Sequence, residues 1–115
     1  MREVLRSKIH RATVTEANPD YVGSITVDED LLDAVGMWVG EKVLVASVDS
    51  GERLETYTLP GERGSGAICV NGAAARRIKE GEVVLIIGFE MTDKPLATRI
   101  AMVDGSNRVT KLIEG

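Results

Sequence analysis

Two stretches of this sequence follow the same order of residues. The first reads Ile25-Thr26-Val27-Asp28, then a short helical pattern, then Gly40-Glu41-Lys42-Val43-Leu44-Val45. The second reads Ile68-Cys69-Val70-Asn71, again a short helical pattern, then Gly81-Glu82-Val83-Val84-Leu85-Ile86. Each stretch contains a strand, a polar capping residue, a helix, a Gly-Glu turn and an apolar strand. Two such units predict a small closed barrel with pseudo-two-fold symmetry, because closure removes the exposed edges of a sheet.

Strand patterns occupy most of the rest of the chain. Two short helices are expected between the strands, one after Asp28 as N-cap and running towards Gly36, the other after Asn71 and running towards Lys79. Alternating and β-branched apolar positions predict strands at residues 3–17, 24–27, 42–48, 53–59, 67–70, 82–90, 97–103 and 108–113. The 115 residues are therefore predicted to form a single, mainly β domain.

Composition and charge exclude several classes of protein. Aromatic residues are few (one Phe, one Trp and two Tyr), so the core must be built mainly from aliphatic side chains. The net charge of −4 argues against broad binding to a nucleic-acid backbone. Cys69 is the only cysteine, which excludes an intrachain disulfide and favours a reducing compartment. With no signal-peptide pattern and no membrane-spanning apolar run, we expect a cytoplasmic protein without a membrane partner.

Metal and phosphate chemistry find little support in the sequence. No set of Cys, His and carboxylate residues has metal-ligand spacing, and His10 is the only histidine. The glycine-rich run at residues 61–66 lacks the spacing of a phosphate loop and is interpreted as a flexible connection. The segment Asn71-Gly72-Ala73-Ala74 differs, because a helix start with small side chains leaves backbone N–H groups accessible to a carboxylate. The same segment also fits a helix that is simply well capped.

The dipeptide Gly23-Ser24 suggests chemistry on the backbone itself. Gly-Ser occurs at residues 23–24, 64–65 and 105–106, and only the first pair lies between apolar, strand-forming residues that could hold its peptide bond distorted. A serine hydroxyl held against the preceding carbonyl can attack it and exchange the amide for an ester. Glycine suits such a position because it lacks Cβ and tolerates unusual φ and ψ angles. On spacing alone, an ordinary turn remains the alternative.

Several motifs, in order, resemble the pyruvoyl-dependent aspartate 1-decarboxylases, small bacterial enzymes that make β-alanine for pantothenate and coenzyme A. The resemblance covers nearly the whole length and fades after about residue 90. This chain has Arg76 where the family often has histidine, at a position to which the resemblance assigns no role. The motifs are Lys8-Ile9-His10-Arg11, Tyr21-Val22-Gly23-Ser24, Arg53-Leu54-Glu55-Thr56-Tyr57, Glu62-Arg63-Gly64-Ser65 and Val70-Asn71-Gly72-Ala73-Ala74-Ala75.

The resemblance implies that the chain cleaves itself between Gly23 and Ser24, giving fragments 1–23 and 24–115. Ser24 then becomes a covalently bound pyruvoyl group at the new N-terminus of the larger fragment. The ketone forms a Schiff base with L-aspartate and acts as an electron sink during decarboxylation to β-alanine, with no metal. The family also implies a six-stranded double-psi β-barrel with short helices, assembled as a homotetramer with active sites between subunits.

The resemblance also implies a role for each site residue. Ser24 and Tyr57 are catalytic, with Tyr57 as proton donor, since a phenol ordinarily keeps its proton at neutral pH. Thr56 orients the scissile carbonyl during self-cleavage and borders the substrate. The two carboxylates of the substrate require local positive charge, supplied by Arg53 as a bidentate clamp and Lys8 as a point charge. The residues implied to bind substrate are Lys8, His10, Arg53, Thr56, Asn71, Gly72, Ala73 and Ala74.

A second class of protein shares part of the pattern. Gly23-Ser24-Ile25-Thr26-Val27, the short helix and Gly40-Glu41-Lys42-Val43 are also similar to the swapped-hairpin barrels of bacterial transition-state DNA-binding regulators. Such a regulator needs a basic face, and Arg76, Arg77 and Lys79 form only a thin one. It would also have no use for the Arg53–Tyr57 motif. The sequence therefore favours the enzyme, without a nucleic-acid partner.

Overall fold

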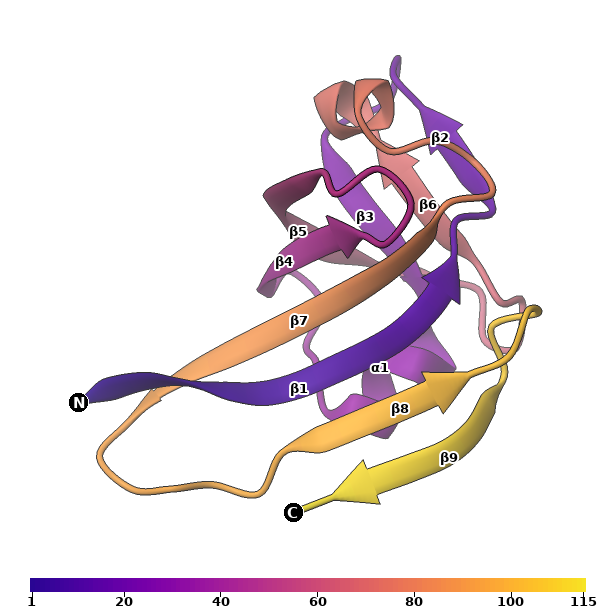
Figure 1. Cartoon of the computed structure of the whole chain (residues 1–115). Coiled ribbons are helices and arrows are strands. Elements are labelled where there is room, and N and C mark those ends of the chain that lie inside the picture. Colours follow the sequence, from indigo (N-terminus) through magenta and orange to yellow (C-terminus); the bar gives the residue numbers. More distant parts are fainter.

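The computed structural model describes residues 1–115 and consists mainly of β-strands (Figure 1). It contains nine strands, one α-helix and one 3₁₀ helix. The elements are β1 (Arg2–Thr13), β2 (Glu16–Asn18), β3 (Ser24–Asp28), α1 (Glu29–Val35), β4 (Lys42–Ser47), β5 (Arg53–Gly61), β6 (Ile68–Asn71), η1 (Gly72–Arg76), β7 (Val83–Thr92), β8 (Arg99–Val103) and β9 (Val109–Glu114). No helix is long and apolar enough to cross a membrane.

Six of the strands form a closed barrel. Along the hydrogen-bonded order, β6, β3, β5, β4, β7 and β1 are successive neighbours. β2 continues β1 along the chain and pairs in parallel with β6, so the ring closes on itself. Between β1 and β2, the N–H of Thr15 donates to the carbonyl oxygen of Ile68 at 2.8 Å. The predicted small closed barrel is confirmed, and its mixed parallel and antiparallel pairing is consistent with the double-psi type.

The strand registers show the internal two-fold symmetry. β3 and β6 are antiparallel, with Ile25 opposite Val70 and Val27 opposite Ile68. In the repeat, Ile25 corresponds to Ile68 and Val27 to Val70, so the two pairs exchange under a two-fold rotation. β4 and β7, the last strands of the two units, are likewise antiparallel neighbours. The repeat seen in the sequence is therefore a repeat of structure.

The two Gly-Glu turns close with the same hydrogen bond. The carboxylate of Glu41 accepts from the N–H of Trp38 at 3.0 Å, and that of Glu82 accepts from the N–H of Lys79 at 2.7 Å. Each glutamate thus binds the N–H three residues before it, immediately ahead of an apolar strand. Glu82 also accepts from the hydroxyl of Ser47. The hydrogen bond from Ser47, followed by that from the N–H of Lys79, holds the pKa of Glu82 below its ordinary value.

The core is aliphatic, as the composition predicted. All four aromatic residues lie at the surface, and each keeps more than a third of its area exposed. The buried hydrophobic cluster consists of Ile9, Ala12, Val14, Ile25, Val27, Leu31, Leu32, Val35, Met37, Val43, Val45, Ile68, Val70, Ala75, Ile78, Val84, Ile86 and Ala101. Inward and outward side chains alternate along β1, β4 and β7, as expected for strands with one face on the core.

One of the two predicted helices differs from expectation. α1 begins after Asp28, whose carboxylate accepts from the N–H of Asp30 at 2.9 Å, and it ends at Gly36 as predicted. The helix after Asn71 is a single stretch of 3₁₀ helix that ends at Arg76, short of Lys79, and the Asn71 side chain does not cap it. The amide of Asn71 is instead directed towards β3, where it donates two hydrogen bonds.

The last two strands lie outside the ring. β8 pairs in parallel with β1, and β9 pairs with β8 as an antiparallel hairpin (Figure 1). Every residue of β9 is exposed, and no strand pairs with its outer edge. The sheet therefore continues past the barrel on one side of β1.

Candidate active site

A cavity of about 420 Å³ opens beside the Gly23–Ser24 bond. Its wall comes from three parts of the chain: the residue before β3, the middle of β5, and the junction of β6 with η1. The lining residues are Gly23, Leu54, Glu55, Thr56, Tyr57, Asn71, Ala73, Ala74 and Arg77. Most of the residues predicted for self-cleavage and catalysis are thus brought to one place.

Strand register explains why these separate motifs meet. β3 lies between β5 and β6 in the sheet. Its parallel register with β5 sets Ile25 opposite Thr58, so the residues just before Thr58 run beside the Gly23–Ser24 bond. Its antiparallel register with β6 sets Ser24 opposite Asn71. The scissile bond therefore has the Thr56–Tyr57 pair on one side and Asn71 on the other.

The hydroxyl of Ser24 is held by hydrogen bonds on both sides. Ser24 is 1% exposed, and its Oγ donates to the carbonyl oxygen of Val22 at 3.1 Å. Nδ2 of Asn71 donates to Ser24 Oγ and to Thr26 Oγ1, each at 3.0 Å. The nucleophile expected from the sequence is thus fixed next to the peptide unit that it would attack.

The unusual backbone lies at Gly72 and not at Gly23. Gly23 does not have a positive φ, and a Cβ built on it would meet no atom within 4 Å. The φ of Gly23 is therefore one that other residues also adopt. Gly72 has a φ of 73°, is buried, and packs against the backbone of Gly23.

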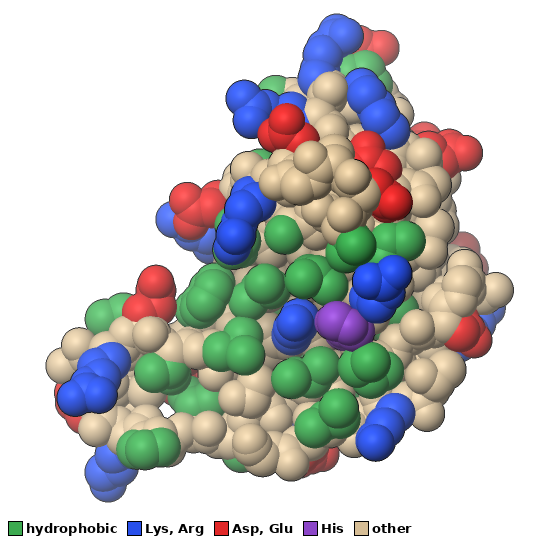
Figure 2. Space-filling model, viewed as in Figure 1, with side chains coloured by type: hydrophobic (Ala, Val, Ile, Leu, Met, Phe, Trp, Pro, Cys, Tyr) green, Lys and Arg blue, Asp and Glu red, His purple; other side chains and the backbone are tan.

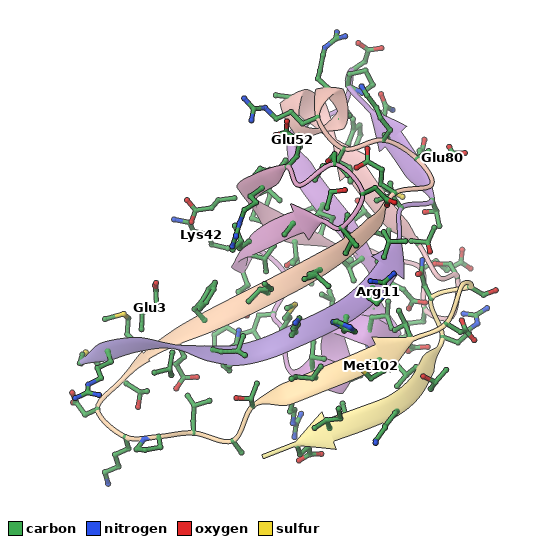
Figure 3. All side chains as sticks on the ribbon, in the orientation of Figure 1. Glu3, Arg11, Lys42, Glu52, Glu80 and Met102 are labelled. Atoms are coloured by element: carbon green, nitrogen blue, oxygen red, sulfur yellow. The ribbon has the colours of Figure 1, made fainter.

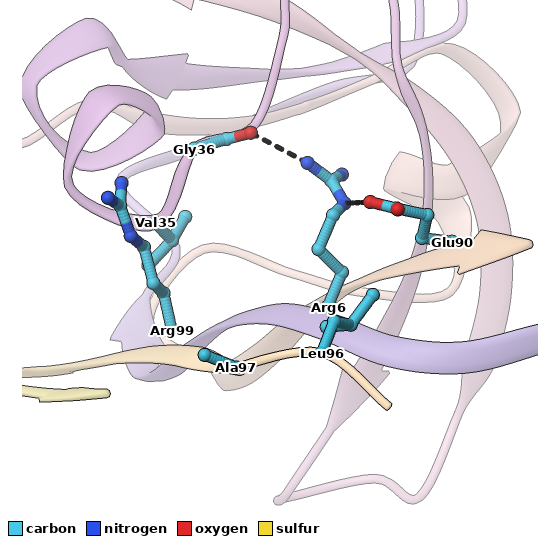
Figure 4. Close-up of a pocket in the computed structure, with 7 residues that line it drawn as sticks. All are labelled: Arg6, Val35, Gly36, Glu90, Leu96, Ala97 and Arg99. Atoms are coloured by element: carbon cyan, nitrogen blue, oxygen red, sulfur yellow. Dashed lines mark hydrogen bonds and ion pairs between the residues drawn. The ribbon is translucent and has the colours of Figure 1, made fainter. Parts of the chain in front are cut away.

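A second cavity, of about 290 Å³, lies where β1 meets the end of α1 (Figure 4). Its central cation, Arg6, donates to the carbonyl oxygen of Gly36 at 2.7 Å and forms ion pairs with Glu41 and Glu90. None of the residues predicted for the site lines it. The contacts of the Arg6 guanidinium join β1 to the end of α1, to the residue before β4 and to β7. No cluster of three or more His, Cys, Asp or Glu side chains could hold a metal.

Comparison with known proteins identifies the family. A family model described as aspartate decarboxylase matches residues 1–110. The chain belongs to the aspartate decarboxylase family. It is 52% identical to an aspartate 1-decarboxylase of Bacillus velezensis and 51% identical to one of Bacillus subtilis, over 97% of this chain and 91% of each relative. The prediction of an enzyme of this family is confirmed.

One further relative and one solved structure are also similar to this chain. An aspartate 1-decarboxylase of Neisseria meningitidis is 49% identical over 97% of this chain and 91% of its own. The crystal structure of the computationally designed protein msDPBB_sym2 aligns with 76% of this chain and 99% of its own, at a TM-score of 0.44 and 20% identity.

Five residues to which the aspartate decarboxylase resemblance gives roles do not line the cavity of this chain. Ser24 and Gly72 are buried directly beside lining residues, whereas Lys8, His10 and Arg53 lie elsewhere. Lys8 and His10 are on β1, separated from β5 by β7 and β4. The registers Lys8–Ile87, Ile87–Leu44 and Leu44–Glu55 put Lys8 three strand spacings from Glu55, roughly 14 Å when followed along the curved sheet. Arg53 is exposed at the first position of β5 and does not line the cavity.

Lys8 and His10 belong to a basic patch on β1 that lies apart from the cavity. Figure 2 shows the histidine and basic side chains over β1, surrounded by hydrophobic side chains. Burial, followed by the charges of Lys8 and Arg11, lowers the pKa of His10. In Figure 3, Arg11 on β1 lies well apart from Glu52, and Glu52 pairs with the cavity residue Arg77 at 3.1 Å. A single chain therefore does not bring the β1 residues to the scissile bond.

Three residues of the cavity wall were not predicted as site residues. They are Leu54, Glu55 and Arg77. Leu54 and Glu55 lie inside the family motif that ends at Tyr57, so their neighbourhood was visible in the sequence. Arg77 directly follows the run that ends at Arg76, but only the fold of η1 brings it to the cavity wall. No local pattern distinguishes it from a surface arginine.

Proposed function

We propose that this protein decarboxylates L-aspartate to β-alanine and carbon dioxide, using a pyruvoyl group that it makes from its own Ser24. One observation carries the proposal: strand register places the Gly23–Ser24 bond between Thr56–Tyr57 and Asn71 on the wall of one cavity. The family assignment supports the same reaction, since the relatives are named for it. The product would enter pantothenate synthesis in the cytoplasm.

Self-cleavage comes first. Ser24 Oγ attacks the carbonyl carbon of Gly23; the new C–O bond replaces the C–N bond, and the hydroxyl proton ends on the nitrogen of Ser24. Loss of the α-proton of Ser24 then breaks its Cβ–O bond and releases Gly23 as a carboxylate. The enamine left at residue 24 rearranges to an imine. Water hydrolyses this imine, which releases ammonia and leaves a ketone at the N-terminus of residues 24–115. The fixed hydroxyl of Ser24 and the nearby Thr56 support this sequence of steps.

In turnover, the ketone supplies an electron sink for the electron pair left when carbon dioxide departs. Tyr57 lines the cavity and keeps 38% of its surface exposed, so its side chain is accessible to a substrate bound there. It returns a proton to the carbon that lost the carboxylate. The small side chains of Ala73 and Ala74 leave room on the opposite wall for the substrate.

Positive charge for the substrate carboxylates comes from Arg53 and Lys8. Lys8 and His10 lie too far from the cavity of their own chain to touch the same small molecule. Another copy would therefore supply them, which supports sites shared between chains, as in the homotetramer that the family resemblance implies. The hydrophobic side chains that surround these residues in Figure 2 suit such a contact.

The test is the formation of β-alanine and carbon dioxide from L-aspartate by the purified protein, with the Ser24→Ala variant beside it. The wild-type chain is expected to turn over. Ser24→Ala is expected to remain one uncleaved chain without activity, because it lacks the attacking hydroxyl. Turnover by Ser24→Ala at the wild-type rate would show that the reaction does not depend on this residue.

A further inference from the structure

The backbone at the start of η1 touches the scissile segment with no side chain between them. A Cβ built on Gly72 would lie 2.6 Å from the Cα of Gly23, 2.8 Å from its nitrogen and 3.1 Å from the carbonyl oxygen of Tyr21. Carbon atoms in favourable contact are about 3.5–4.0 Å apart, so no side chain fits at Gly72 unless the segment before Ser24 moves. The obstructing atoms belong to the backbone and cannot swing aside like the end of a side chain.

We propose that Gly72 is a positioning residue for self-cleavage. The bare Cα of Gly72 is the surface on which Gly23 rests, and this contact keeps the carbonyl carbon of Gly23 within reach of Ser24 Oγ. The inference rests on the proposed function and deepens it. It gives Gly72 a task in maturation, before any substrate binds, and differs from the substrate-binding role that the family resemblance implies.

The effect falls on Gly23 because Ser24 is held independently. Ser24 belongs to β3, pairs with Asn71, and receives a hydrogen bond from the Asn71 amide. On the other side of the scissile bond, Tyr21 and Val22 are exposed and lie outside any strand. A Cβ built on Gly23 would meet no atom within 4 Å, so Gly23 has open space on that side, and its backbone has to shift if residue 72 carries a methyl group. A methyl group on residue 72 would therefore move the electrophile and leave the nucleophile in place.

Small displacements matter for such a reaction. Reacting atoms in a productive arrangement are about 3–3.5 Å apart, and a shift of about 1 Å can slow a step by about 10²-fold. Relief of the contacts at Gly72 requires a movement of that order, since the closest of them is 2.6 Å. Gly72→Ala is therefore expected to fold and to cleave slowly.

The experiment compares Gly72→Ala with Gly51→Ala. Gly51 has nearly the same φ, 77° against 73°, but a Cβ there would meet no atom within 4 Å. Both variants thus carry the same strain of a left-handed residue, and only one disturbs the scissile segment. The first-order rate of cleavage is followed by intact mass on freshly purified chains, with and without hydroxylamine, which intercepts the ester.

Gly51→Ala is expected to cleave at the wild-type rate, and Gly72→Ala at least about 10²-fold more slowly. Hydroxylamine is expected not to restore cleavage of Gly72→Ala, because the ester does not form. Wild-type cleavage of Gly72→Ala would overturn the inference and leave the proposed function standing. Recovery with hydroxylamine would also overturn it, since the defect would then lie in elimination. A wild-type chain that never cleaves would overturn both.

Folding is tested separately, in a Ser24→Ala background where no cleavage occurs. Ser24→Ala/Gly72→Ala and Ser24→Ala/Gly51→Ala are compared by thermal unfolding and by their association state. Both are expected to unfold cooperatively and to assemble like Ser24→Ala alone. If only the Gly72→Ala version failed to fold, Gly72 would be required for the fold and the positioning role would be wrong.

Discussion

Asn71 shows how one side chain can fit a local pattern and act elsewhere. As a polar residue before a helix it was expected to cap η1 and to bind substrate. Its amide nitrogen instead donates to the hydroxyls of Ser24 and Thr26. Its side-chain oxygen, the atom that would cap a helix, accepts no N–H group of η1. Its placement opposite Ser24 depends on the pairing of β3 with β6, which no short stretch of sequence reveals.

Tyr57 separates maturation from turnover. Tyr57→Phe is expected to cleave itself fully, since that step uses Gly23, Ser24 and Thr56. Its kcat should fall by about 10²–10⁴-fold, the usual contribution of a general acid. The measurement is kcat on protein shown by mass to be fully processed. Near-normal turnover by the processed variant would move the proton donor to another group.

Two arginines compete for the substrate clamp. Arg53 is the family's candidate, whereas Arg77 lines the cavity but already pairs with Glu52. Arg53→Lys keeps the charge and loses the planar fork, which should cost about 1.5–3 kcal/mol in kcat/KM, or roughly ten- to over a hundred-fold. Arg53→Ala should cost more than Arg77→Ala. The opposite ranking, measured with L-aspartate on processed protein, would assign the clamp to Arg77.

At the scale of elements, Asp28 links α1 to the glycine-rich segment 61–66. Asp28 is 1% exposed, and its carboxylate accepts from the N–H groups of Asp30, Gly64 and Gly66 at 2.9, 3.1 and 2.8 Å. The interpretation of this segment as a flexible connection is therefore not supported. Its glycines allow the backbone to wrap around a buried carboxylate, an arrangement that depends on a residue more than thirty positions away.

Removal of this carboxylate should weaken the fold. Asp28→Ala leaves three N–H groups without their acceptor, two of them far along the chain, and should lower the free energy of unfolding by about 2–4 kcal/mol. Asp30→Ala is the control, because the Asp30 carboxylate is exposed and binds only Arg63. Denaturant titration of both variants tests the difference. Equal, small losses would mean that Asp28 has little part in joining α1 to the segment.

The elements show which parts of the fold were predictable. The strands and the Gly-Glu turns of the two repeat units could be predicted, because each is a local pattern of apolar residues bounded by turn residues. Closure was visible only in outline, since it depends on Thr15 and β2 reaching β6 from the far end of β1. The site followed the same rule. Thr56 and Tyr57 meet Gly23 through one strand pairing, whereas Lys8 and His10 lie on β1, which is separated from β5 by β7 and β4.

At the scale of the whole molecule, the distance of Lys8 from the cavity predicts shared sites. Lys8→Ala and Tyr57→Phe should each be nearly inactive alone. Co-expressed, they should form mixed assemblies in which some sites take Lys8 from one chain and Tyr57 from another, so part of the activity returns. Mixing the two purified proteins without subunit exchange is the control. Activity no greater than the sum of the separate variants would mean that each chain builds its own site.

The central claim is that the protein makes its own prosthetic group at Gly23–Ser24. Intact-protein mass spectrometry tests it most directly, because one spectrum reports both the cleavage and the group. The expected result is two fragments, residues 1–23 and 24–115. The larger one should be lighter, by the mass of one ammonia, than the same fragment with an unmodified serine at its N-terminus. A preparation that decarboxylates L-aspartate at full rate while every chain remains uncleaved would contradict the account.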